Sequence, residues 1–163
     1  MTGLIEPTRR LICQGLAIGA GLGLMPARAH APADAHRLKW QPDQTTNKAF
    51  ITRALALAKQ GAERGDGPLV GAVIVLNGRI IGRAANRVDL KGDPTAHAEV
   101  EAIRVACHRL GSRALSRAVL YVGGPPPCPM CETASYWASM AEIYHGSSPD
   151  EVIKLGAPRY GGC

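Results

Sequence analysis

Apolar and small residues recur at helical spacing in the segment that follows residue 44. They fall on one face of the chain, three or four residues apart: Phe50, Ala54, Leu57, Ala58 and Gly61. This period predicts an amphipathic helix. Thr45 or Thr46 can cap its first turn, and Gly65-Asp66-Gly67-Pro68 ends it because glycine and proline interrupt helices.

A β-hairpin is predicted for the stretch VGAVIVLNGRIIGRAANRV, residues 70–88. Two apolar, partly β-branched runs flank the dipeptide Asn77-Gly78. This dipeptide is a strong hairpin signal because both turn residues must accept positive φ.

The rest of the chain alternates between helical and extended patterns. The predicted elements are a helix over 96–110 (AHAEVEAIRVACHRL), a strand over 118–122, a helix over 130–140, a strand over 142–145 and a short helix over 150–155. This alternation of helices and strands predicts an α/β fold, with a sheet covered by helices on both faces.

The N-terminal residues have the pattern of a secretory signal rather than of a folded core. Arg9-Arg10 precedes the Gly-rich apolar stretch of residues 11–25, and two overlapping A-x-A triplets follow within residues 27–31. The apolar stretch is shorter than the about 18–20 residues that a membrane-spanning helix needs. The alternatives are a poorly hydrophobic membrane anchor or a mispredicted start codon.

Thr8-Arg9-Arg10-Leu11-Ile12 also resembles a bacterial twin-arginine signal, which implies export of an already folded protein. We expect a signal peptide over residues 1–31, an exposed lead-in segment over 32–44 and one domain over 45–163. The mature chain is then expected in the periplasm and not in a membrane. It is expected in the cytoplasm if the signal is not functional.

Charge does not indicate a nucleic-acid partner. The chain has 19 Lys and Arg against 13 Asp and Glu, and removal of residues 1–31 lowers the net charge from +6 to +4, because three cations and one anion leave. The few aromatic residues are not interleaved with basic ones, as a platform for single-stranded nucleic acid would require. A mildly basic, solvated surface is the simpler interpretation.

Two cysteines two residues apart, in Cys128-Pro129-Met130-Cys131, stand between a predicted strand and the next helix. At a helix start, unpaired backbone N–H groups and the positive end of the dipole lower thiol pKa and favour metal binding. The pair alone is compatible with a redox dithiol, half of a structural zinc site or chance.

A second segment, His97-Ala98-Glu99, opens the preceding helix. His97, Cys128 and Cys131 make three ligands where a structural zinc site has four, so the fourth position is left for water. A redox dithiol gives no reason for Glu99 to stand two residues from a histidine. Singly, the histidine and the glutamate are more often ordinary helix-start residues.

His-x-Glu followed by Pro-Cys-x-x-Cys is typical of zinc-dependent base deaminases. With TAHAEVEAIR and PPCPMC, and with the order of elements, the chain resembles the cytidine deaminase-like superfamily. The resemblance implies a three-layer α/β/α fold with a mixed five-stranded sheet, and a deaminase domain over 45–163. It implies a Zn²⁺ cofactor held by His97, Cys128 and Cys131. Glu99, a non-ligand, would be the catalytic acid and base that moves protons during loss of ammonia.

Within the superfamily, GDGPLVGAVIVLNGRIIGRAANRV, DPTAHAEVEAI and CETASYWA resemble the guanine deaminase branch. The resemblance implies a small nucleobase or nucleoside as substrate, with guanine as the first choice. It assigns substrate binding to Asn86, Ala98 and Trp137, with Asn86 hydrogen-bonded to the base. An ordinary strand-end role for Asn86 is the alternative. The resemblance also implies a homodimer.

Three departures from the branch affect the choice of substrate. Pro126 replaces a Glu near the zinc loop, and residues 68–71 are one residue longer than the usual Pro-Phe-Gly. Arg159 stands where the branch has an Asp that helps to recognise guanine. A cation there could favour an anionic substrate, which would make Arg159 a substrate-binding residue. Equally, Arg159 could belong to a frayed C-terminus.

Other functions stay open. Cytosine, adenosine and aminotriazines carry the same amidine-like carbon, and transfer-RNA adenosine deaminases share both motifs. A non-catalytic zinc or redox protein is a further alternative, but Glu99 has no structural duty at a zinc site. Its presence favours catalysis.

Overall fold

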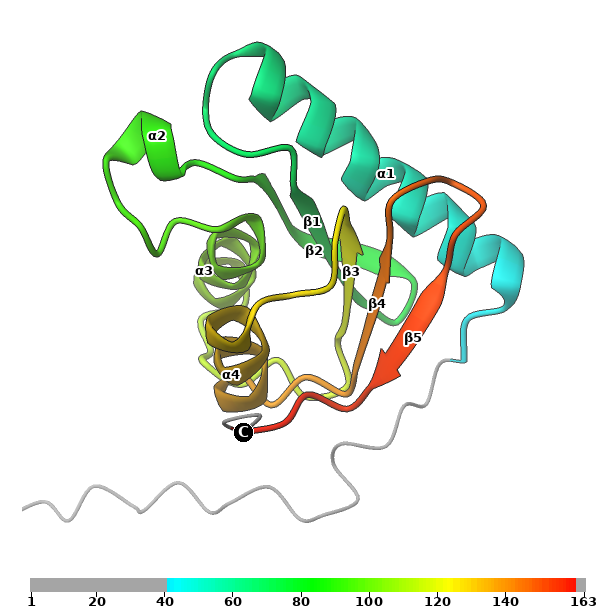
Figure 1. Ribbon diagram of the computed structural model, residues 1–163. Coiled ribbons are helices and arrows are strands. Elements are labelled where there is room, and N and C mark those ends of the chain that lie inside the picture. The colour runs from blue at the N-terminus through cyan, green and yellow to red at the C-terminus, as the bar shows by residue number, and fades with distance from the viewer. Residues whose placement is uncertain (1–40, 161–163) are drawn as a thin grey trace, which may run out of the picture. The chain divides into compact units, whose positions relative to one another are not determined.

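A computed structural model describes residues 41–160 (Figure 1). A mixed five-stranded sheet with the strand order β2-β1-β3-β4-β5 forms its centre. β1 pairs antiparallel with β2 and β3, β3 and β4 are parallel, and β4 and β5 are antiparallel. The predicted signal peptide, residues 1–31, lies outside the described residues. In the described part of the chain, no helix is both long and apolar enough to span a membrane.

Helix α1 (Gln44–Glu63) covers one face of the sheet (Figure 1). Its apolar face packs on side chains of β1, β3 and β4, among them Val73, Val75, Val119, Tyr121 and Tyr144. The predicted helix is therefore confirmed, but its cap is not the threonine that the sequence suggested. Asp43 is the N-cap, and its Oδ1 accepts a hydrogen bond from the backbone N–H of Thr46 at 2.7 Å.

The hairpin of β1 (Gly71–Leu76) and β2 (Arg79–Ala85) lies at one edge of the sheet. Asn77 and Gly78 form its turn with φ of 50° and 76°. Both residues are in the left-handed region that two-residue hairpin turns require, as the sequence predicts.

Helices α3 (Ala98–Leu110) and α4 (Pro129–Trp137) cover the opposite face (Figure 1). They enclose a second core that includes Ile74, Ala102, Ala106, Leu120 and Ile143. Helices thus pack on both faces of the sheet, and the predicted three-layer α/β/α class is confirmed. Because β3 (Val119–Gly123) and β4 (Glu142–Gly146) are parallel, both strands finish at the same end of the sheet. The loop that carries Cys128 follows β3 at this end.

The prediction of a helix over residues 150–155 is wrong. β5 (Ile153–Gly156) occupies this part of the chain and pairs with β4. So short a segment forms few helical hydrogen bonds against the cost of nucleation, whereas the open edge of β4 offers backbone partners. The ammonium of Lys154 also reaches Glu142 Oε1 on β4 at 2.7 Å.

Two smaller differences concern helix boundaries. α4 ends at Trp137 rather than at residue 140, because Ser139 adopts a left-handed conformation with φ of 59°. A short helix, α2 (Val88–Lys91), stands between β2 and α3, where no helix was predicted.

Candidate metal centre and active site

The three predicted metal ligands lie at the starts of two helices. His97 is the N-cap residue of α3 and Cys128 is that of α4, while Cys131 lies in the first turn of α4. Neither cap residue uses its side chain to cap its helix. The imidazole and the thiol are therefore available to bind a metal.

The donor atoms of these residues converge. His97 Nδ1 lies 3.7 Å from Cys128 Sγ and 3.5 Å from Cys131 Sγ, and the two sulfurs are 3.5 Å apart. With Zn–S about 2.3 Å and Zn–N about 2.0–2.1 Å in tetrahedral geometry, donors are expected about 3.6–3.8 Å apart. The triangle therefore fits one zinc ion. Within residues 41–160, this is the one cluster of three such donors.

The three ligands differ in burial. Cys131 is fully buried, whereas His97 and Cys128 are half-buried. Burial raises the pKa of the Cys131 thiol, and the neighbouring Glu99 carboxylate raises it further. The helix dipole, which led us to expect a lowered pKa, does not prevail at this thiol. Both cysteines are free thiols rather than a disulfide, so zinc binding releases protons from the site.

Glu99 lies in the first turn of α3, two residues after His97, and is 3% exposed. Its Oε2 is buried and has no hydrogen-bond partner among the described residues. A buried carboxylate oxygen without a partner is costly, so its presence here calls for a functional explanation. The orphaned oxygen is available to a water or a substrate atom beside the metal ligands.

The predicted substrate-binding residues Asn86 and Ala98 are both buried. Asn86 follows β2, and its Oδ1 accepts a hydrogen bond from the backbone N–H of Val88 at 3.0 Å. Ala98, the first residue of α3, is completely inaccessible to solvent. Ala98 can therefore support the site through packing, without a side-chain polar contact.

The structure does not bring Trp137 to the metal ligands. Trp137 ends α4, six residues and about 9 Å along the helix axis from Cys131. Its side chain is 63% exposed and packs edge-on against Tyr136 and Tyr160, with ring centroids 5.6 and 5.5 Å away. Its predicted role in substrate binding stays a prediction.

Arg159 packs on α4 instead of standing free. Its Nε lies 3.3 Å from Glu132 Oε1, and its backbone N–H donates to the same oxygen at 3.2 Å. Glu132 directly follows the ligand Cys131. The sequence analysis missed this residue, because its partner is 27 residues away and no local pattern links the two. The Arg159 side chain remains 80% exposed, so the contact is a surface ion pair.

Residues 44–147 match the protein family described as "Cytidine and deoxycytidylate deaminase zinc-binding region". The chain is 42% identical over 110 residues to a guanine deaminase from Bacillus subtilis (strain 168), a match that covers 68% of this chain and 70% of the relative. It is 44% identical over 98 residues to a tRNA-specific adenosine deaminase from Agrobacterium fabrum (strain C58), covering 60% of this chain and 63% of the relative's length.

A solved structure of guanine deaminase from Bacillus subtilis is similar to the fold described above. The superposition has a TM-score of 0.59 and 45% sequence identity, and it covers 61% of this chain and 62% of that chain. The predicted resemblance to the cytidine deaminase-like superfamily is confirmed, and the chain belongs to the cytidine and deoxycytidylate deaminase zinc-binding family.

Proposed function

We propose that this protein is a zinc-dependent hydrolytic deaminase of an amino-substituted nucleobase or a related heterocycle. The observation that carries the proposal is the pairing of the ligand triangle with the buried Glu99, whose Oε2 has no partner among the described residues. Three ligands leave a coordination position for water, and a carboxylate that is not a ligand stands ready to move its protons.

When bound by His97, Cys128 and Cys131, zinc would lower the pKa of water and so supply a nucleophile at neutral pH. Glu99 would take a proton from the attacking water and deliver it to the ring nitrogen. The same carboxylate would then carry a proton to the departing amino group. Water is consumed, the C–N bond breaks, and ammonia and a ring carbonyl are formed.

Guanine is the proposed substrate because of the similarity to guanine deaminase. Asn86 would orient the base. Its carbonyl oxygen is engaged by the backbone of Val88, which leaves its amide N–H groups to meet an acceptor on the ring.

Adenosine in transfer RNA is the second proposed substrate. The specific support is 44% identity to the tRNA-specific adenosine deaminase of Agrobacterium fabrum. A short RNA hairpin with adenosine in its loop tests this substrate directly. If the protein deaminates the RNA hairpin but not free guanine, adenosine in transfer RNA would replace guanine as the proposed substrate.

The decisive experiment measures ammonia release by the zinc-loaded protein. The panel contains guanine, adenine, cytosine, their nucleosides, an aminotriazine and the RNA hairpin. Glu99→Gln, with its zinc content measured, is the matched control. Turnover that disappears in this variant while zinc stays bound supports the proposal. A zinc-loaded protein that acts on no member of the panel would contradict it.

Export is part of the proposal and rests on Arg9-Arg10 and the apolar residues 11–25. A reporter fused to residues 1–35 should appear in the periplasm, and should stay in the cytoplasm when Arg9 and Arg10 are replaced by lysine. A cytoplasmic location for the unaltered fusion would contradict export.

A homodimer is also proposed. Its support is the family resemblance and the exposed aromatic cluster of Tyr136, Trp137 and Tyr160 beside α4. Sedimentation velocity should give the mass of two chains, and Trp137→Ser should weaken the association. A monomer at every concentration would contradict this part of the proposal.

A further inference from the structure

Residues 86–97 form one segment that connects β2 to α3 and bears Asn86 and His97 at its two ends. We call it the bridging segment. Two backbone hydrogen bonds within the segment link its ends. The Arg87 N–H donates to the carbonyl oxygen of Ala96 at 2.9 Å, and the Ala96 N–H donates to the carbonyl oxygen of Asp93 at 3.0 Å. The position of Asn86 relative to the metal ligand His97 therefore depends on how this segment is held.

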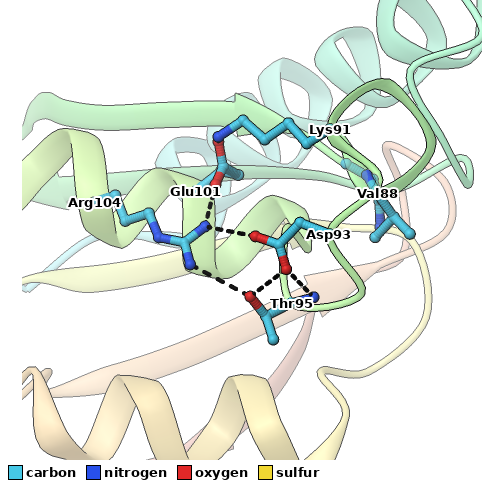
Figure 2. Close-up of polar contacts among 7 residues, drawn as sticks. Val88, Lys91, Asp93, Thr95, Glu101 and Arg104 are labelled. Carbon is cyan, nitrogen blue, oxygen red and sulfur yellow. Dashed lines mark hydrogen bonds and ion pairs between the residues drawn. The ribbon is translucent and has the colours of Figure 1, made fainter.

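One buried carboxylate on α3 holds the middle of the bridging segment. Glu101 is 6% exposed, and its Oε2 receives the ammonium of Lys91, from α2, at 2.5 Å. Its other oxygen receives the guanidinium of Arg104, one turn further along α3. Figure 2 shows Glu101 between these two cations. A buried carboxylate of this kind is tolerated because it is paired on both oxygens.

Arg104 extends the same contact to a second point of the bridging segment. Its Nη2 lies 3.4 Å from Thr95 Oγ1, and its Nη1 lies 4.0 Å from Asp93 Oδ2 (Figure 2). Asp93 Oδ1 in turn accepts from the backbone N–H and the hydroxyl of Thr95 at 2.8 and 2.7 Å. Thr95 stands two residues before His97, so these contacts reach the metal ligand end of the segment.

Two backbone hydrogen bonds also join the segment to Asp66. The carbonyl oxygen of Asp66 accepts from Asp89 N–H at 3.1 Å and from Leu90 N–H at 3.0 Å. Among the described residues, the side-chain polar contacts that reach residues 86–96 from outside the segment come from Glu101 and Arg104. Without the charge of Glu101, Lys91 loses its anchor and the Lys91 and Arg104 cations lose their shared counter-ion.

We propose that Glu101 is a positioning residue that fixes the bridging segment and so holds Asn86 in place for substrate binding. The inference rests on the proposed function, since Asn86 is assigned there to the base. The Glu101 side chain binds Lys91 and Arg104, and only its backbone N–H contacts a metal ligand, donating to the carbonyl oxygen of His97 at 2.9 Å. The effect of Glu101 is expected on KM more than on kcat, because Glu99 in α3 and the two cysteine ligands at the start of α4 lie outside the bridging segment.

The test compares Glu101→Gln with Glu142→Gln in the zinc-loaded full chain. Glu142 is a matched control: it is a partly buried carboxylate that binds Lys154 at 2.7 Å and the Tyr144 hydroxyl at 2.9 Å, on β4 and away from the bridging segment. We expect Glu101→Gln to raise KM about tenfold and change kcat less than about threefold, with zinc retained. Glu142→Gln should leave KM unchanged. An unchanged KM in Glu101→Gln, or an equal rise in both variants, would overturn the proposal.

Lys91→Met provides a second variant on a partly exposed side chain. It should raise KM as well, and it should add little in the Glu101→Gln background, because both changes break the same contact. Fully additive effects would show that Glu101 does not act through Lys91.

Hydrogen exchange separates this inference from the proposed function. Amides of residues 87–96 should exchange faster in Glu101→Gln than in the wild-type protein or in Glu142→Gln. Faster exchange in a protein that deaminates no base would leave the positioning role in place and reject the function. Unchanged exchange would reject the positioning role whatever the activity.

Discussion

His97 Nδ1 and Cys131 Sγ lie 3.5 Å apart although 34 residues separate them in the chain. β3, which pairs in parallel with β4, separates α3 from α4 in the sequence. Both helices pack on the same face of the sheet (Figure 1). Their first turns thereby meet, and the metal site is assembled by the packing of the two helices.

Cys131→Ser should abolish stoichiometric zinc binding. Cys131 is the buried corner of the ligand triangle, and a serine hydroxyl is a poor replacement for a thiolate. Metal analysis of the purified variants measures the effect. Cys107→Ser is the control, since Cys107 is a free thiol outside the cluster and should keep full zinc. Retention of zinc in Cys131→Ser would show that another residue supplies the third ligand.

Glu99→Gln should lower kcat by about 10²–10⁴-fold, because the amide cannot accept and return protons. Its stability without metal should not fall, since the replaced oxygen has no hydrogen-bond partner within residues 41–160. Steady-state kinetics and thermal unfolding of the metal-free protein check the two effects. Glu63→Gln, a change of an exposed carboxylate on α1, should affect neither quantity. Near-normal turnover in Glu99→Gln would remove Glu99 from the mechanism.

Tyr121→Phe should lower the free energy of unfolding by about 1–3 kcal/mol. The Tyr121 hydroxyl donates to Asn47 Oδ1 at 2.7 Å in the interior, and the variant leaves that oxygen unsatisfied. The ring contacts with Phe50 and Tyr144 are kept. Urea unfolding gives the value. Tyr136→Phe, at an exposed position, should change stability by less than about 0.5 kcal/mol. Equal effects of the two changes would contradict the assignment.

Acid should weaken the fold in part through Glu101. Burial acts to raise the pKa of Glu101, but the hydrogen bonds and charges of Lys91 and Arg104 outweigh it, so that the pKa lies below its ordinary value of 4.5. A folded-state pKa below the unfolded one stabilises the protein above the unfolded value, and this contribution is lost as the pH falls through the folded pKa.

Unfolding curves from pH 7 down to pH 3 test this contribution. The loss of stability on acidification should be smaller in Glu101→Gln, which has no carboxylate to protonate. A pH dependence identical to that of the wild-type protein would show that Glu101 is not ionised in the fold.

Gly71→Ala should prevent folding or cost more than about 4 kcal/mol. A Cβ at this position of β1 would lie 2.1 Å from the backbone oxygen of Ala54 in α1, and neither backbone can yield without moving an element. Gly92→Ala meets no atom within 4 Å and should cost only about 1 kcal/mol, for its left-handed φ. Yield of soluble protein and urea unfolding measure both. A stable Gly71→Ala variant would contradict the close packing of α1 on the sheet.

Local pattern was sufficient for much of the fold. The apolar period of α1, the Asn77-Gly78 turn and the α3 segment each express an interaction between near neighbours, and the structure has each of these elements. The segment at 150–155 was wrongly predicted as a helix. It forms a strand because its backbone pairs with β4, and the local sequence pattern contains no information about that pairing. The N-cap was also misplaced, since Asp43, Thr45 and Thr46 are all capable caps.

The sequence by itself determined which residue types form the candidate site, three metal-ligand types and a glutamate, and their positions at helix starts. Each half of the site is a local motif, His97 to Glu99 and Cys128 to Cys131. Only the tertiary structure decided which distant side chains meet. It joined Arg159 to Glu132 and Lys91 to Glu101, and it buried Cys131 enough to raise its pKa. Such contacts depend on how the sheet and helices pack, and spacing along the chain does not encode them.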